Sequence, residues 1–187
     1  MVYKPYGMLS QFVRVGKRKK RLLGELQDFP EGTMSIGRLD EHSEGLLLLT
    51  TDGKTSHTVR SKKVEKEYYV QVDGLITPSA LNSLSNGVEI TVDGGPYTTL
   101  PCKATTFETA PELPPRAKKI RDDRHGPTSW ISITITEGKN RQVRKMTAAV
   151  GFPTLRLVRV RIGNVYLGTM APEAVVEVAS LNMPEST

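Results

Sequence analysis

The passage SIGRLDEHSEGLLLLTTDG, residues 35–53, holds the side chains best suited to chemistry. Its apolar run, Leu46–Leu49, predicts a buried strand, and Asp52 with Gly53 predicts a turn that closes it. Ionisable groups directly before such a strand would have a rigid support, as acid–base or nucleophilic work by a carboxylate requires. The ten residues 37–46 carry five of them, namely Arg38, Asp40, Glu41, His42 and Glu44.

A second passage, EGKNRQVRKMTAAVGFP, residues 137–153, predicts a glycine turn followed by a helix. Val143 and Met146 share the face that would pack on the core. The opposite face presents positive charge without an interleaved acid, which is unfavourable unless an anion lies beside it. The residues on that face are Arg141, Arg144 and Lys145.

Positive charge is clustered rather than spread along the chain. Lys and Arg number 26 against 20 for Asp and Glu, and RVGKRKKR, residues 14–21, has six basic side chains in eight positions. Clusters of this kind favour a polyanionic partner, nucleic acid first and a membrane surface a distant second. The predicted RNA-binding residues are Arg18, Lys19, Lys20, Arg21, Lys139, Arg141, Lys145 and Arg159.

Several other chemistries find no support in the sequence. The three histidines lack the spacing of metal ligands, and DGKTS misses the phosphate-loop pattern because Leu48 stands where a glycine is needed. No nucleotide-binding glycine fingerprint or nucleophile elbow occurs. We therefore expect no metal and no organic cofactor. The lone Cys102 fits a reducing, cytoplasmic setting, and no apolar run approaches the length of a membrane span.

The hydrophobic pattern predicts an α+β fold with a mixed, mostly antiparallel sheet and few helices. Thr77, Pro78 and the Asn86–Gly87 pair mark the start and end of one short helix. We expect a basic loop over 14–33, a proline-rich insertion over 106–128 and a tail over 182–187. The predicted strands are Val2–Lys4, Met34–Ile36, Leu46–Thr51, Glu67–Val72, Val88–Thr91, Trp130–Thr136, Thr154–Val160 and Val175–Ala179.

Tyr68 lies in the predicted strand KEYYVQVDG, where alternation puts it on the same face as Val70 and Val72. A tyrosine among valines is more often packed in a core than exposed to a ligand. An aromatic platform for a nucleobase is the alternative. The residues alone favour the packed interpretation.

Taken in order, GRLDEHSEGLLLLTTDG, KEYYVQV and EGKNRQVRKM resemble the three motifs of the RsuA-type ribosomal RNA pseudouridine synthases. YKPYGMLSQF resembles the family's opening strand and turn, and GFPTLRLVRVRIG resembles its closing segment. The chain is most similar to the RluE branch, which lacks a small N-terminal RNA-binding module. The resemblance implies one catalytic domain over 1–187, with two subdomains that share a bent sheet around a central active-site cleft.

The resemblance also implies roles for individual residues. Asp40 stands at the family's essential aspartate, which acts on the ribose as a nucleophile or as a base. Arg144 stands at the basic residue that would pair with Asp40 and keep it ionised. Tyr68 stands at the tyrosine that stacks on uracil, which reverses the interpretation from the strand pattern. Arg38 stands at the arginine that helps to displace the target base.

The predicted function is therefore the isomerisation of one uridine to pseudouridine in large-subunit (23S) ribosomal RNA, by a monomer in the cytoplasm and without a membrane partner. Two alternatives remain open. One is a non-catalytic RNA-binding or ribosome-assembly protein of the same fold. The other is a pseudouridine synthase that acts on a different RNA.

Overall fold

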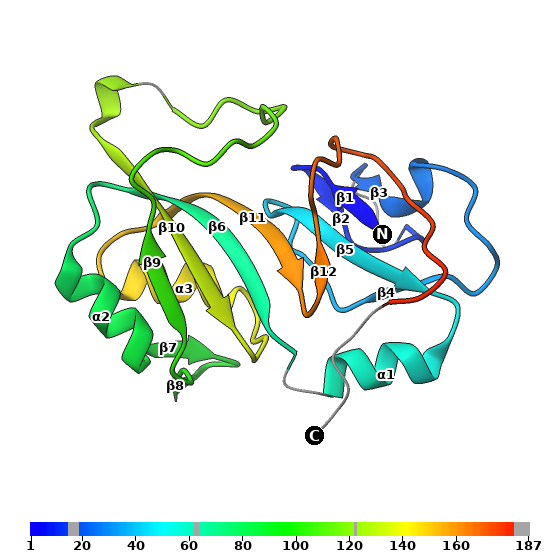
Figure 1. Ribbon diagram of the computed structural model, residues 1–187, viewed down its shortest axis with the longest axis horizontal. Coiled ribbons are helices and arrows are strands. Elements are labelled where there is room, and N and C mark those ends of the chain that lie inside the picture. Colours follow the sequence, from blue (N-terminus) through cyan, green and yellow to red (C-terminus); the bar gives the residue numbers. More distant parts are fainter. Residues whose placement is uncertain (15–18, 62–63, 122, 182–187) are drawn as a thin grey trace. The chain divides into compact units, whose positions relative to one another are not determined.

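The computed structural model describes residues 1–14, 19–61, 64–121 and 123–181 (Figure 1). The chain forms two compact units. The first comprises Met1–Val64, Pro114–Lys118 and Val158–Thr187, and the second comprises Glu65–Leu113 and Lys119–Leu157. The predicted RNA-binding residue Arg18 and the predicted tail 182–187 lie outside the described residues. The division into one domain with a shared sheet stays a prediction.

The first unit is built around strand β5 (Glu44–Thr50), whose leucines 46 to 48 are fully buried. β1 (Val2–Lys4) and β4 (Met34–Ile36) both pair with it antiparallel. The end of β11 (Thr154–Ile162) pairs with it in parallel and continues into β12 (Val165–Tyr166). A continuous apolar run suits a strand that has neighbours and packing on all sides. The short elements β2 (Met8–Leu9), β3 (Arg21–Leu22) and η1 (Leu23–Glu25) complete the N-terminal part.

Helix α1 (Gly53–Ser61) follows β5 and packs against β4 and β5. The sequence predicted a turn at Asp52 and Gly53 and no helix after it. That prediction is wrong, because α1 begins at Gly53. Both oxygens of Asp52 accept backbone N–H groups, from Lys54 and Thr55, each at 3.0 Å. These bonds lower the pKa of the Asp52 carboxyl, behind the larger effect of the Thr55 hydroxyl. An aspartate before a helix start satisfies donors that have no partner within the helix, so Asp52 begins a helix here.

The second unit carries a three-stranded antiparallel arrangement, in which β10 lies between its two partners. Helix α2 packs against β9, and helix α3 packs against β7 of a separate hairpin (Figure 1). The elements are β6 (Lys66–Asp73), α2 (Pro78–Asn86), β7 (Glu89–Val92), β8 (Gly95–Thr98), β9 (Lys103–Thr106), η2 (Asp123–His125), β10 (Thr128–Ile135) and α3 (Gln142–Ala149).

The predicted start and end of α2 are confirmed. The Thr77 side chain accepts a hydrogen bond from the Ala80 N–H at 3.2 Å, and Pro78 is the first helical residue. Gly87 ends the helix with a φ of 99°, a backbone conformation that glycine adopts without strain. The cap, proline and glycine therefore specify this helix locally.

The predicted α+β class with a mostly antiparallel sheet is confirmed. The β11–β5 and β2–β3 pairs are parallel, whereas the pairs β1–β5, β4–β5, β6–β10, β9–β10, β11–β12 and β7–β8 are antiparallel. The predicted strand Val175–Ala179 is wrong. Val175 forms an isolated bridge with Val2, and Val176 exchanges two backbone hydrogen bonds with Met1, but the side chains of Val176 and Val178 are exposed. Alternating valines there do not make a strand because the chain passes β1 only briefly.

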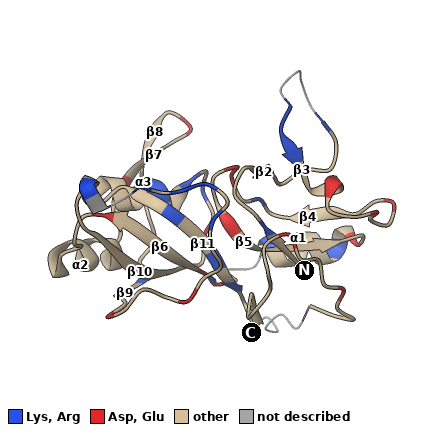
Figure 2. Cartoon of the chain, turned by 90° about the horizontal axis from the view of Figure 1, so that it is seen from above, with Lys and Arg blue, Asp and Glu red and all other residues tan. Residues whose placement is uncertain are grey.

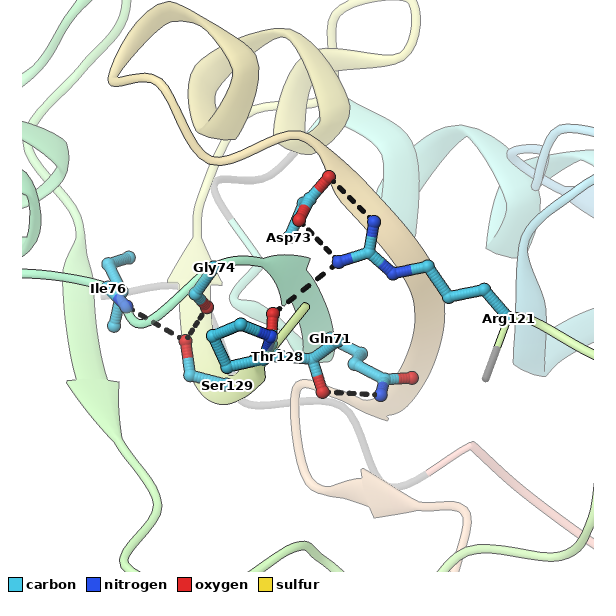
Figure 3. A network of polar contacts seen from close by, with 8 residues as sticks. Gln71, Asp73, Gly74, Ile76, Arg121, Thr128 and Ser129 are labelled. Atoms are coloured by element: carbon cyan, nitrogen blue, oxygen red, sulfur yellow. Dashed lines mark hydrogen bonds and ion pairs between the residues drawn. The ribbon is translucent and has the colours of Figure 1, made fainter. Parts of the chain in front are cut away.

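The proline-rich insertion runs from the end of β9 to the start of β10. Its return into β10 is bound to the end of β6, as Figure 3 shows: Arg121 pairs with both carboxylate oxygens of Asp73. The Ser129 hydroxyl donates to the Gly74 carbonyl at 2.8 Å and accepts from the Ile76 N–H at 2.9 Å. These contacts fix the exit of the insertion within the second unit.

Replacement of Gly45 by alanine should destabilise the first unit strongly. Gly45 has a φ of 101°, and a Cβ there would lie 2.3 Å from the Arg159 carbonyl oxygen across the parallel strand pair. Left-handed strain and overlap with backbone predict a loss of roughly 2–5 kcal/mol in the free energy of unfolding, measured by urea denaturation. Gly53→Ala is the matched control, because its Cβ would meet nothing within 4 Å. Equal stability of the two variants would contradict the close approach.

Candidate active site

The Asp40 loop, defined as residues 37–43, joins β4 to β5 in the first unit. Within it, Asp40 binds its own turn. Its Oδ1 accepts the His42 N–H at 3.0 Å and the Ser43 hydroxyl at 2.8 Å, and its carbonyl accepts the Ser43 N–H at 3.1 Å. Aspartate favours turns of this kind because its side chain reaches a backbone N–H two residues ahead. The carboxylate of Asp40 is thus fixed in one orientation.

Ser10 binds the same loop from the N-terminal segment. Its hydroxyl donates to the Leu39 carbonyl at 2.7 Å and accepts the Leu39 N–H at 3.0 Å. The Gly7 N–H also donates to the Glu41 carbonyl at 2.8 Å. The residues on both sides of Asp40, Leu39 and Glu41, are therefore held in place by hydrogen bonds to their backbones.

Lys4 lies beneath this arrangement and is fully buried. Its Nζ donates to the Met8 carbonyl at 2.7 Å and the Pro5 carbonyl at 2.9 Å, with a longer contact of 3.5 Å to the Glu41 carbonyl. Burial lowers the pKa of Lys4 to about 8, against the opposing effect of Asp40, Glu44 and Glu41. A buried ammonium needs such acceptors. Lys4 thus links the start of the chain to the Asp40 loop.

Arg159 is a predicted RNA contact that the structure places in the interior. It is only 4% exposed, and its Nε donates to the Leu46 carbonyl at 2.8 Å. Its charge also opposes that of Lys4 and lowers the pKa of that lysine. An RNA-binding role for Arg159 stays a prediction, while its visible function is to bind the β5 backbone.

Tyr68 lies in β6 of the second unit, and alternation along the strand is as predicted. Tyr68 is 7% exposed, and Val70 and Val72 on the same face are fully buried. Ile133 of β10 stands directly opposite Tyr68 in the strand pair. An aromatic ring beside a β-branched residue on neighbouring strands is a stabilising pair. The packing of Tyr68 is therefore established, and its stacking on uracil stays a prediction.

The residues before α3 are organised by Glu137, which accepts the Tyr97 hydroxyl, the Leu100 N–H and the Gln142 side-chain amide. Lys139 lies 4.7 Å above the Tyr97 ring. Arg141 then adopts a left-handed conformation with a φ of 52°, directly before the helix. Such a backbone is strained for a residue other than glycine and requires support from its surroundings. Glu137 and Gln142 supply that support.

Figure 2 marks the lysines and arginines along the chain, and these residues differ in what they contact. Lys20 pairs with Glu41, and Arg21 pairs with both oxygens of Glu173 at 2.7 and 3.0 Å. The predicted contacts Lys19, Lys139 and Arg141 are exposed, and Lys145 is half-buried. The basic residues counted in the sequence therefore include some that form ion pairs with acids of the same unit.

The predicted site residues fall into two sets. Asp40 and the exposed Arg38 belong to the first unit, and Tyr68 and Arg144 belong to the second. The Asp40–Arg144 pair stays a prediction. Sequence reasoning missed Lys4, Ser10 and Ser43, whose roles depend on contacts with the Asp40 loop.

Among the residues that the structure describes, the His, Cys, Asp and Glu side chains form no group of three or more that could hold a metal ion. Among the helices described, none combines the length and apolar character that a membrane crossing needs.

Comparisons with known proteins agree with the motifs. The model of the RNA pseudouridylate synthase family matches residues 1–149. Ribosomal large subunit pseudouridine synthase E of Xanthomonas axonopodis pv. citri is 45% identical over 92% of this chain and 89% of its own. Synthase B of Salmonella typhi is 37% identical over 72% of this chain and 40% of its own. A crystal structure of a pseudouridylate synthase has a TM-score of 0.71 at 28% identity, covering 92% and 66% of the two chains.

The chain therefore belongs to the RNA pseudouridylate synthase family and is a pseudouridine synthase. Its similarity to synthases E and B confirms the predicted RsuA type and the resemblance to the RluE branch.

Lys4 should give the protein a measurable dependence of stability on pH. Unfolded lysine keeps its proton up to about pH 10.5, but folded Lys4 keeps it only to about 8. The unfolded state binds more protons in this window, so the free energy of unfolding should rise with pH across it, by roughly 2–3 kcal/mol. In Lys4→Met this rise with pH should be absent. The variant should also lose a part of the free energy of unfolding that does not depend on pH, because the hydrogen bonds of Lys4 to backbone carbonyls are gone. Denaturation at pH 8 and 10.5 measures the difference.

The control for this measurement is Lys54→Met, because Lys54 is an exposed lysine at the start of α1. The account of Lys4 would be wrong if wild type and Lys4→Met showed parallel pH curves.

Proposed function

We propose that this enzyme converts a uridine to pseudouridine in large-subunit ribosomal RNA, with Asp40 as the reacting carboxylate. The observation that carries the substrate is the 45% identity to a ribosomal large subunit pseudouridine synthase E across nearly the full length of both chains. The observation that supports Asp40 is its fixed turn before a strand whose leucines 46 to 48 are fully buried.

The reaction is an isomerisation with no net gain or loss of atoms. The bond from C1′ of ribose to N1 of uracil breaks, the base turns, and C5 bonds to C1′. C5 then loses its proton, and N1 gains one. The Asp40 carboxylate assists either by attacking C1′ or by taking a proton from C2′. Both roles need an ionised group whose position is fixed before the substrate arrives.

The remaining site residues complete the proposal. Arg144 pairs with Asp40 and favours its ionised form. Tyr68 stacks on the uracil, and Arg38, which is exposed, contacts RNA as the target base leaves its helix. The exposed basic residues Lys19, Lys139 and Arg141, with half-buried Lys145, bind phosphates. The proposal includes a cytoplasmic monomer that needs no metal or organic cofactor.

A non-catalytic RNA-binding role would require the charged surfaces but not the geometry of Asp40. The Asp40 carboxylate accepts two hydrogen bonds, and Ser10 binds both backbone groups of the preceding residue. A carboxylate whose position is fixed in advance is what the chemistry requires, so the arrangement favours catalysis. An enzyme acting on another RNA remains distinguishable by experiment.

Asp40→Asn should abolish pseudouridine formation in ribosomal RNA transcribed in vitro. Asparagine keeps the size of the side chain and can accept the same turn bonds, but it supplies no carboxylate. We expect the rate to fall by about 10²–10⁴-fold or more. Carbodiimide treatment followed by reverse transcription reads the product, and filter binding should show RNA affinity close to that of wild type.

Asp93→Asn is the matched control, because Asp93 lies exposed in the β7–β8 turn with a φ of 50°, which asparagine tolerates. An Asp40→Asn variant as active as this control would exclude Asp40 from the chemistry. Modification of another RNA instead of large-subunit RNA would correct the substrate alone.

A further inference from the structure

A stack of three planar side chains adjoins the Asp40 loop in the first unit. The rings of Tyr6 and His42 lie 5.2 Å apart with an interplanar angle of 17°. The guanidinium of Arg116 lies 4.5 Å from the centre of the Tyr6 ring. We name this group the Tyr6 stack. Its members come from the turn after β1, from the Asp40 loop and from the proline-rich insertion.

The Tyr6 stack is joined directly to the reacting carboxylate. His42 contributes its ring to the stack, and its own backbone N–H donates to Oδ1 of Asp40 at 3.0 Å. Tyr6 lies between Pro5 and Gly7, whose backbones contact Lys4 and the Glu41 carbonyl. A substrate group on the stack would therefore lie at a fixed place relative to Asp40.

Arg116 brings the insertion to this position. The segment Pro114–Lys118 belongs to the first unit, whereas the residues before and after it belong to the second. Arg116 is half-buried, and its Nε donates to the Lys118 carbonyl at 2.7 Å, which orients the guanidinium within its own segment. The contact with Tyr6 is thus made by a side chain that is held within its own segment.

The chemistry of the stack matches one kind of partner. Histidine and tyrosine rings and arginine planes are the groups on which proteins stack unpaired RNA bases, and arginine adds attraction to phosphate. His42 is exposed, and Tyr6 and Arg116 are half-buried, so part of the stack is accessible. An RNA base, which has two flat faces, fits this stack better than a polypeptide would.

We propose that the Tyr6 stack binds a nucleotide next to the target uridine and that Arg116 is a specificity-determining residue. The inference rests on the proposed function, because it assumes an RNA substrate with Asp40 at the reacting nucleotide. It goes further in assigning a task to the insertion: Arg116 contributes to the choice of uridine.

The test uses an RNA fragment centred on the uridine that pseudouridine mapping identifies, in whichever RNA it occurs. Abasic nucleotides replace the neighbours of that uridine one at a time. With wild-type enzyme, one such replacement should raise KM by roughly 5- to 100-fold, the range of one base stacking on a side chain. Arg116→Ala should raise KM on the intact RNA to a similar extent. The two changes combined should cost little more than either alone.

The controls separate recognition from folding and from charge. Lys118→Ala removes one positive charge from the same segment and should leave KM within about twofold. Tyr6→Leu removes the aromatic ring and should reproduce the rise in KM of Arg116→Ala. Thermal unfolding of each variant reports its structural effect.

The proposal is overturned if Arg116→Ala lowers the melting temperature but leaves KM unchanged, because the stack then only packs the insertion. It is also overturned if the abasic replacement raises KM by the same factor for wild type and for Arg116→Ala. A mapped uridine outside large-subunit RNA would instead correct the proposed substrate, while the abasic series would still decide the role of the stack.

Discussion

The fixed orientation of the Asp40 carboxylate is the constraint on which the rest of the site depends. One oxygen accepts two hydrogen bonds from the two residues that follow Asp40 by two and three positions. Three other residues of the first unit act on the backbone of the same loop. Ser10 binds Leu39, Gly7 binds Glu41, and Lys4 reaches the Glu41 carbonyl from below. Positioning a reacting group in advance reduces the entropy that the reaction must overcome.

This arrangement depends on buried charge, which is costly unless each group has partners. Lys4, Glu44 and Arg159 are each at most 4% exposed. Lys4 donates to backbone carbonyls, and the carboxylates near it offset part of the cost of its burial. Arg159 donates to a backbone carbonyl through Nε, while its Nη2 is buried without a hydrogen-bond partner among the described residues. β5 provides the rigid base, since its leucines 46 to 48 are fully buried and Gly45 allows β11 to approach closely. The rigidity of the Asp40 loop therefore depends on the packing of β5.

Local signals in the sequence were sufficient for the elements whose determinants are local. β1 and β4 have the predicted bounds, and α2 begins and ends at its cap and glycine. α1 was missed because an Asp-Gly pair is as typical of a turn as of a helix start. A strand was wrongly predicted after Val175 because Val176 and Val178 have the alternation that is typical of strands. The Asp40 loop was predicted from its residue types. Ser10 and Lys4 were not, because the contacts that join them to this loop span 29 and 37 residues, and spacing does not encode such contacts. Charge alone also failed to distinguish the paired Arg21 from the exposed Lys19.

The most direct measurement of the central claim is the single-turnover rate of Asp40→Glu on its RNA substrate. Glutamate keeps a carboxylate but moves it outward by one methylene and breaks the turn bonds to His42 and Ser43. If orientation governs the chemistry, the rate should fall by about 100-fold or more, the loss expected from a displacement near 1 Å, while RNA affinity is retained. A rate equal to that of wild type would contradict the account, because it would show that a carboxylate suffices without its fixed position.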